Sequence, residues 1–149
     1  MILISHRGNI DGPNEAMENN PIYINMALES GYDVEVDVYS VSGKCFLGHD
    51  IPQYEVEWDY LSNSKFWCHA KNIEALEIML DKQIHCFWHQ QDDVVLTSRG
   101  FVWTYPGKQL TSKSICVLPE NIKNNNFDIA VGLCSDFVSM YSVETPINE

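Results

Sequence analysis

The stretch DVEVDVYSV, residues 33–41, begins with a strict alternation of acidic and apolar side chains. Successive side chains of a β-strand point to opposite faces, so this pattern predicts a strand with carboxylates on one face and valines on the other. In a parallel barrel we expect the valines to face the helix layer and the acidic groups to face the interior. Two interpretations of Glu35 and Asp37 stay open: oxygen ligands of a hard divalent cation such as Mg²⁺ or Ca²⁺, or the solvated face of an edge strand.

Strand-like and helical patterns extend from this stretch in both directions. Before it, the sequence predicts a strand at residues 2–5 and a helix that begins at Pro21 after the cap Asn20 and ends at Gly31. After it come a hairpin extension at residues 44–50, a helix at residues 72–82, and strands at residues 65–71, 84–90, 101–105, 114–119 and 129–137. The alternation of strands and helices predicts a parallel sheet with helices outside it.

The length of 149 residues suits one domain, residues 1–149. A complete eightfold barrel needs about 250 residues, and several later connections are too short for a full helix. We therefore expect an α/β fold: a shortened TIM-type (β/α) barrel of about seven mostly parallel strands, with several helices missing in its second half. A homo-oligomer, in which a partner chain covers strands left without helices, is a further expectation.

Composition excludes several classes of protein. Hydrophobic residues make up 45% and charged residues 20%, as in ordinary globular proteins, and the net charge of −12 would repel nucleic acids and anionic membranes. No apolar run approaches the roughly 20 residues that cross a bilayer, so we expect no membrane insertion and a cytoplasmic location. Five scattered cysteines in apolar runs, without a Cys-x-x-Cys pair, predict small buried hydrophobic residues.

Four histidines stand at the ends of predicted strands, each beside a polar or charged residue. They are His6, His49, His69 and His89, and their neighbours are Arg7, Asp50, Lys71 and Gln90. A single histidine at a strand end is more often a packing residue than a ligand. Four in one short chain favour an active site, because barrel enzymes place their active sites at the carboxyl ends of the strands.

The motifs HRGN at residues 6–9, EN at residues 18–19, VEVDV at residues 34–38 and FLGHD at residues 46–50 occur in this order. Together they resemble the pattern of the glycerophosphodiester phosphodiesterase family, within the wider barrel group that includes phosphoinositide-specific phospholipase C. VGLCSDF at residues 131–137 is similar to the closing strand of that family.

The resemblance implies a metal-assisted phosphodiesterase. It implies that His6 and His49 are the acid–base pair, that Arg7 and Lys71 contact the phosphate, and that Glu35 and Asp37 bind Mg²⁺ or Ca²⁺. A substrate hydroxyl next to the phosphodiester would attack phosphorus, and water would open the resulting cyclic phosphate. The expected substrate is a small phosphodiester, such as a glycerophosphodiester or a phosphate-linked sugar.

One motif departs from the family pattern. The family carries Glu-x-Lys on its third strand, whereas residues 69–71 read HAK, so His69 stands in place of a carboxylate. An imidazole suits Mn²⁺, Zn²⁺ or Co²⁺ better than Mg²⁺ or Ca²⁺. We expect a retained but altered metal site that includes His69.

Residues beyond this motif offer groups for the rest of the substrate. We expect His89, Trp103 and Glu120 to bind it, and the alternative for Trp103 is a cover over a core that lacks helices. Asp136 is interpreted as the cap of the closing turn. A second hypothesis for the whole chain is a degenerate barrel that binds a phosphorylated or sugar ligand without cleaving it, as a subunit of an oligomer.

Overall fold

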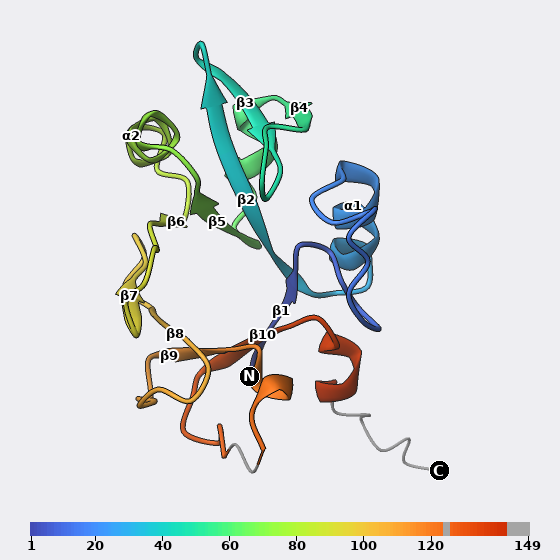
Figure 1. Cartoon of the computed structure of the whole chain (residues 1–149), viewed down its shortest axis with the longest axis vertical. Coiled ribbons are helices and arrows are strands. Elements are labelled where there is room, and N and C mark those ends of the chain that lie inside the picture. Colours follow the sequence, from blue (N-terminus) through green and yellow to red (C-terminus); the bar gives the residue numbers. More distant parts are fainter. Residues whose placement is uncertain (124–125, 143–149) are drawn as a thin grey trace.

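The computed structural model describes residues 1–123 and 126–142, which form one ten-stranded sheet with two α-helices (Figure 1). The strands are β1 (Ile2–His6), β2 (Asp33–Val41), β3 (Lys44–Leu47), β4 (Tyr54–Val56), β5 (Phe66–Ala70), β6 (Cys86–Phe87), β7 (Val94–Leu96), β8 (Val102–Thr104), β9 (Ser114–Val117) and β10 (Gly132–Ser135). The α-helices are α1 (Pro21–Glu29) and α2 (Ile73–Asp81), and the 3₁₀ helices are η1 (Trp58–Ser62), η2 (Pro119–Asn121) and η3 (Val138–Tyr141). Among these residues no helix has the length and apolar character to cross a membrane.

Parallel ladders join β8, β9, β10, β1, β2, β5 and β6 in that spatial order. Antiparallel strands are added at the edges: β3 pairs with the second half of β2, β4 pairs with β3, and β7 pairs with β8. The sheet curls, so that β6 lies near the pair of β7 and β8 at the other end of the sheet (Figure 1). The rings of Phe87 on β6 and Trp103 on β8 pack together, with centroids 4.7 Å apart. No ladder joins these two strands within the described residues.

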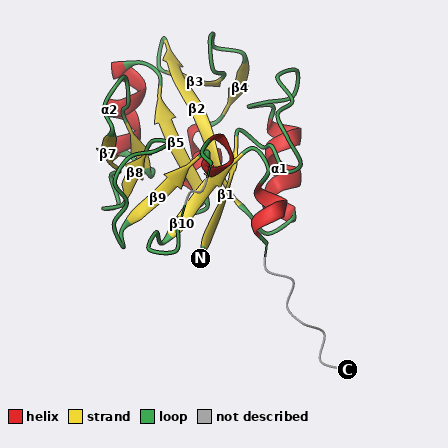
Figure 2. Ribbon diagram, turned by 60° about the horizontal axis from the view of Figure 1, so that its bottom comes forward, coloured by secondary structure: helices red, strands yellow, loops and turns green. Residues whose placement is uncertain are grey.

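The prediction of a TIM-type barrel is therefore wrong: the fold is a mixed sheet curled into a half-barrel. In a TIM barrel each parallel strand is followed by a helix, the strands close into a complete barrel, and the helices form a ring around it. Here the α-helices are only α1 and α2 in the described chain, and they cover the part of the sheet around β1, β2 and β5 (Figure 2). The second half of the chain uses turns, an antiparallel strand and 3₁₀ helices instead.

Strand β2 separates two environments, as its alternating sequence predicts. Val34, Val36 and Val38 are fully buried and pack with residues of α1 and α2. On the opposite face Glu35 and Asp37 are only 3% and 0% exposed. Because β2 is paired on both sides and these carboxylates are buried, the edge-strand interpretation is wrong.

Both predicted helices are confirmed, and each begins after an asparagine cap. The side chain of Asn20 accepts a hydrogen bond from Ile22 N. Asn72 Oδ1 accepts from Ala75 N and also from Ser40 N, while Asn72 Nδ2 donates to Ser40 O. Asn72 therefore both starts α2 and fixes this helix to the end of β2.

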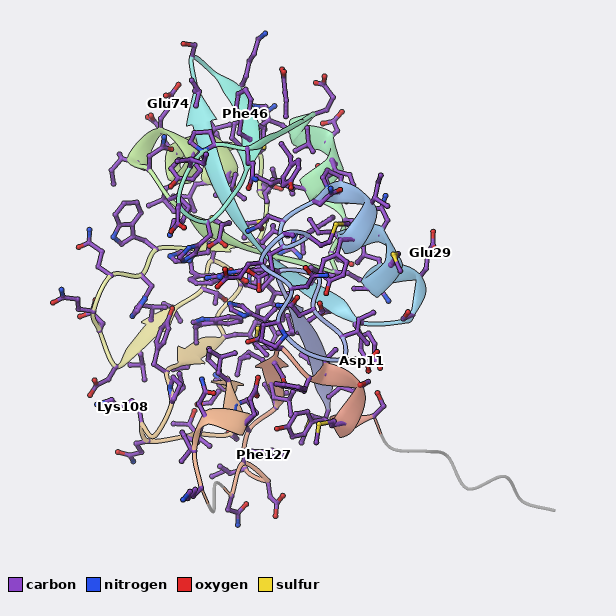
Figure 3. The ribbon with its side chains drawn as sticks, turned by 45° about the vertical axis from the view of Figure 1, so that its right-hand side comes forward. Asp11, Glu29, Phe46, Glu74, Lys108 and Phe127 are labelled. Carbon is purple, nitrogen blue, oxygen red and sulfur yellow. The ribbon has the colours of Figure 1, made fainter. Side chains whose placement is uncertain are left out.

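A second core fills the inside of the curled sheet. Its buried residues include Ile4, Trp67, Phe87, Trp103, Ile115 and Val117. Side chains occupy the space that the ribbons leave open, and Lys108 and Phe127 lie at the periphery (Figure 3). All five cysteines are buried, reduced thiols, as their apolar surroundings predict.

His85 belongs to this interior rather than to a strand-end site. It is 3% exposed, its ring lies against Trp67 with centroids 4.3 Å apart, and its Nε2 is 2.8 Å from Thr97 Oγ1. Burial, with a smaller effect from Arg99, lowers the pKa of His85 from 6.5 to about 4. The imidazole is neutral in the folded protein at neutral pH.

We predict that His85 makes the protein less stable in mild acid. Between pH 6.5 and 4 the unfolded chain binds a proton at His85 that the folded chain does not bind. The contribution of neutral His85 to the free energy of unfolding is complete above pH 6.5, and about 3 kcal/mol of it is lost as the pH falls to 4. Urea unfolding at several pH values should give a flatter pH dependence for His85→Gln than for the unmodified chain; parallel curves would contradict the assignment.

Candidate active site at the strand ends

Three neighbouring strands place the acidic and basic side chains together. In the register of the sheet, His6 at the end of β1 pairs with Glu35 on β2, and Asp37 on β2 pairs with His69 on β5. The strands are parallel, so these side chains lie toward the same edge of the sheet. The convergence arises from the positions of the residues along their strands.

Two adjacent cavities open at this edge. One has a volume of about 220 Å³; its charged wall contains His6, Arg7, Glu35, His49 and His69. Its other wall is apolar and aromatic, with Phe87, Trp103, Tyr105, Val117 and Leu118, and His89 also lines it. The second cavity, of about 530 Å³, is polar, and Arg7 and His49 line both. The histidines from HRGN and FLGHD therefore meet at one cavity.

His6 is oriented by Asp136, which follows β10. Its Nδ1 lies 2.7 Å from Asp136 Oδ1, and its Nε2 lies 3.7 Å from Glu35 Oε2. Burial alone lowers the pKa of His6, but the hydrogen bond to Asp136 and the charge of Glu35 outweigh it and raise the pKa above 6.5. With Asp136 ionised, Nδ1 carries the proton that it donates, which leaves Nε2 at the cavity.

A second layer of polar groups holds Asp136. Asn9 Nδ2 donates to Asp136 Oδ1 at 2.9 Å and to Glu18 Oε1 at 2.8 Å. Glu120 accepts hydrogen bonds from Asp136 N and Ser135 Oγ, both at 2.9 Å. Glu120, expected from the sequence to bind substrate, lines neither cavity and instead supports the end of β10.

Arg7 adopts a left-handed backbone conformation, with φ of 57°. Its N donates to Glu35 O at 2.9 Å, and its O accepts from Asn19 N at 3.1 Å. Its guanidinium forms ion pairs, Nε with Asp37 Oδ2 at 3.1 Å and Nη1 with Glu18 Oε2 at 3.6 Å. A non-glycine residue in this region costs about 1–3 kcal/mol and persists only where its surroundings hold it. The backbone hydrogen bonds and the two ion pairs offset this strain and fix Arg7 between the two cavities.

Glu35, Asp37 and His69 form a set that fits a divalent cation. One donor atom from each lies within 4.8 Å of the others. Glu35 Oε2 and Asp37 Oδ1 are buried without a hydrogen-bond partner, although His69 Nδ1 lies 3.2 Å from Asp37 Oδ1. Two carboxylate oxygens and one imidazole nitrogen suit Mn²⁺ or Zn²⁺.

The electrostatics of the two carboxyl groups differ. Burial and the nearby charge of Asp37 raise the pKa of Glu35 from 4.5 to about 7. Burial also acts to raise the pKa of Asp37, but His69, Arg7 and Asn19 outweigh it and lower the value to about 2. Asn19 donates to Asp37 Oδ2 and accepts from Asp37 N, both at 3.0 Å. Asp37 is thus a fixed carboxylate, and Glu35 is the less compensated member.

The remaining predicted residues take different positions. The side chain of His49 is 44% exposed, and its Nδ1 lies 2.8 Å from Asp50 Oδ1. The ring of His89 stacks on Tyr105 with centroids 3.6 Å apart, whereas Trp103 is 2% exposed and also belongs to the inner core. Lys71 lines neither cavity. Asp136, interpreted from the sequence as the cap of the closing turn, is the hydrogen-bond partner of His6, which the sequence did not predict; its position near the carboxyl end of the strand predicted at residues 129–137 was a usable signal.

Comparison with known proteins gives no relative: no protein-family model, no curated protein and no solved structure matches the chain significantly. The resemblance to glycerophosphodiester phosphodiesterases accordingly stays a prediction from the motifs.

We predict that Glu35→Gln stabilises the metal-free protein. A carboxyl group whose pKa rises from 4.5 to about 7 on folding contributes stability below pH 4.5 that is lost as the pH rises through 7. At pH 8 the substitution should therefore raise the free energy of unfolding by about 1–3 kcal/mol in the presence of a chelator.

The same variant should lose stabilisation by a cation. Addition of Mn²⁺ or Zn²⁺ should raise the melting temperature of the unmodified chain but not that of Glu35→Gln. Glu55→Gln is the matched control, because Glu55 is an exposed carboxylate of β4. Equal metal-dependent shifts in all three proteins would show that this cluster does not bind the cation.

Proposed function

We propose that this protein cleaves a small phosphodiester that carries a hydroxyl group next to the phosphate, such as a glycerophosphodiester or a phosphate-linked sugar. The observation that carries the proposal is the meeting of His6, Arg7 and His49 at one cavity, beside the buried pair Glu35 and Asp37. Each of these residue types serves phosphoryl transfer: imidazoles move protons, and the positive groups stabilise charge on the phosphoryl oxygens.

The two cavities support a position for the substrate. Arg7 and His49 line both, so a phosphate between them would have one alcohol portion in each cavity. The smaller cavity adjoins His6 and suits the portion with the attacking hydroxyl. The larger cavity, which His49 lines and His6 does not, suits the leaving group.

In the proposed reaction, His6 Nε2 accepts the proton of the substrate hydroxyl as its oxygen forms a bond to phosphorus. The bond from phosphorus to the leaving oxygen breaks, and His49 donates a proton to that oxygen. The products are an alcohol and a cyclic phosphate, which water opens with the two histidines in exchanged roles. Each such proton transfer contributes about 10²–10⁴-fold to the rate.

Glu35, Asp37 and His69 would hold a divalent cation beside the phosphate, and the cation would supply Lewis-acid stabilisation of the phosphoryl oxygens. The guanidinium of Arg7 would also stabilise the negative charge on the phosphoryl oxygens. Its ion pair with Asp37 fixes the guanidinium before substrate arrives, so less reorganisation is needed during the reaction.

The ion pair also favours a second candidate function, the binding of a phosphorylated ligand without cleavage. Arg7 and His69 already compensate Asp37, so this carboxylate is partly neutralised by the chain itself. In that case the chain would bind a phosphodiester and release it unchanged. Detection of product separates the two functions.

We expect the protein to cleave glycerophosphodiesters in the presence of Mn²⁺ or Zn²⁺. Phosphorus NMR monitors the reaction and also shows whether it stops at the cyclic phosphate. His6→Gln and His49→Gln should each lower the rate by at least about 100-fold. His85→Gln is the matched control, because His85 is a buried histidine away from both cavities. No turnover with any divalent metal, or equal rates in the histidine variants, would remove the hydrolytic proposal.

Asp136 is proposed as a positioning residue that acts through His6. Asp136→Asn removes the charge that helps to raise the pKa of His6, so the limb of the kcat/KM profile that reports His6 should move to lower pH. The value of kcat should fall by about tenfold or more, because the imidazole loses its fixed orientation. A lower rate with an unmoved pH profile would indicate only a structural role.

A further inference from the structure

The outer side of α2 carries a second surface, away from the strand-end site. Two hollows lie there, of about 380 Å³ and 220 Å³, and Leu80 lines both. The larger hollow is also lined by Ile73, Leu76, Glu77 and Asp81. The smaller one is lined by Gln83, Ile84, Ser98 and Arg99.

This helix has apolar residues on two sides. Ala75 and Met79 are fully buried against the sheet. Ile73 and Leu80, on the outer side, are 65% and 51% exposed. Large apolar side chains grouped in a hollow and rimmed by charge are typical of a surface that a protein partner covers.

The charges of the two hollows are opposite. Glu77 and Asp81 give the larger hollow a negative edge. Arg99, one of only two arginines in a chain of net charge −12, lies in the smaller hollow, where its Nη2 donates to Gln83 O at 3.3 Å. Glu74 is engaged elsewhere, because its Oε1 accepts from Gly43 N, and it lies near the β2–β3 hairpin (Figure 3).

We propose that this surface binds a second copy of the same chain across a two-fold axis that passes near Leu80. A two-fold axis at the residue common to both hollows places the larger hollow of one copy against the smaller hollow of its partner. Glu77 and Asp81 then face the partner's Arg99 on both sides of the axis, while the two Leu80 side chains meet at its centre. The surface is complementary to itself in both charge and apolar character, and this favours a second copy of the chain as the partner that covers it.

The other α-helix provides a matched comparison. On α1, Ile22 and Met26 are 69% and 53% exposed, and neither α1 nor α2 contains a lysine or arginine within its bounds. The surface of α2 differs because Arg99 lines the hollow that it shares with Leu80, whereas α1 lines none of the four cavities described above. A self-association through α1 would therefore lack the opposite charges that α2 and Arg99 supply. Exposure alone does not distinguish the two helices, whereas the position of Arg99 beside α2 does.

Sedimentation of the full chain over a range of concentrations tests the proposal. We expect a dimer for the unmodified chain and for Met26→Glu, and a dissociation constant at least about 100-fold higher for Leu80→Glu. Glu77→Arg and Arg99→Glu should each weaken the dimer, and the double variant Glu77→Arg/Arg99→Glu should restore it. Circular dichroism checks that each variant is folded.

The charge exchange keeps the test valid even if one single variant folds poorly, because recovery in the double variant requires contact between the two positions. A monomer at all concentrations would overturn the proposal and leave the surface to a different partner. A dimer that Leu80→Glu leaves intact would also overturn it. Neither result bears on catalysis, since no residue of this surface lines the cavities of the proposed active site.

Discussion

The burial of two carboxylates on the inner face of β2 is the constraint on which the rest of the site depends. Glu35 and Asp37 are almost completely removed from solvent, and an uncompensated buried charge is strongly destabilising. Each neighbouring element therefore supplies a compensating group: β1 supplies His6, the turn after it supplies Arg7, and β5 supplies His69. The compensation is incomplete, because one oxygen of each carboxylate has no hydrogen-bond partner, and that deficit is what suits the pair to a cation.

The two halves of the chain contribute different chemistry to the same cavity. His6, Glu35 and His69 come from β1, β2 and β5, which are neighbours in the sheet and are backed by the helices. The apolar wall comes from β6, β8 and β9 and the residues that follow them, including Phe87, Tyr105 and Leu118. A low-polarity wall opposite charged groups strengthens their electrostatic effect, because less water screens them.

The local structure was predictable where a residue pattern reports its own surroundings. The alternation in residues 33–41 determines which side chains of β2 face the helices, and the asparagine caps locate both α-helices. The open, mixed sheet was not predictable, because it depends on pairing between distant segments, and the short strands β4 and β7 carry too few residues for a clear period. His6 and Arg7 lie in a local motif, which was enough to identify them as site residues. The roles of Asp136 and Glu120 depend on contacts between distant segments and required the tertiary structure.

The ladder between β1 and β10 has a consequence for the order in which the molecule assembles during synthesis. Residues 35, 37 and 69 leave the ribosome well before Asp136, which is 130 positions after its partner His6. The cluster of Glu35, Asp37 and His69 can therefore form in a nascent chain, while the imidazole of His6 stays without its orienting carboxylate until β10 inserts beside β1. Closing so long a loop is entropically costly and slow, which makes the pairing of His6 with Asp136 one of the last events of folding.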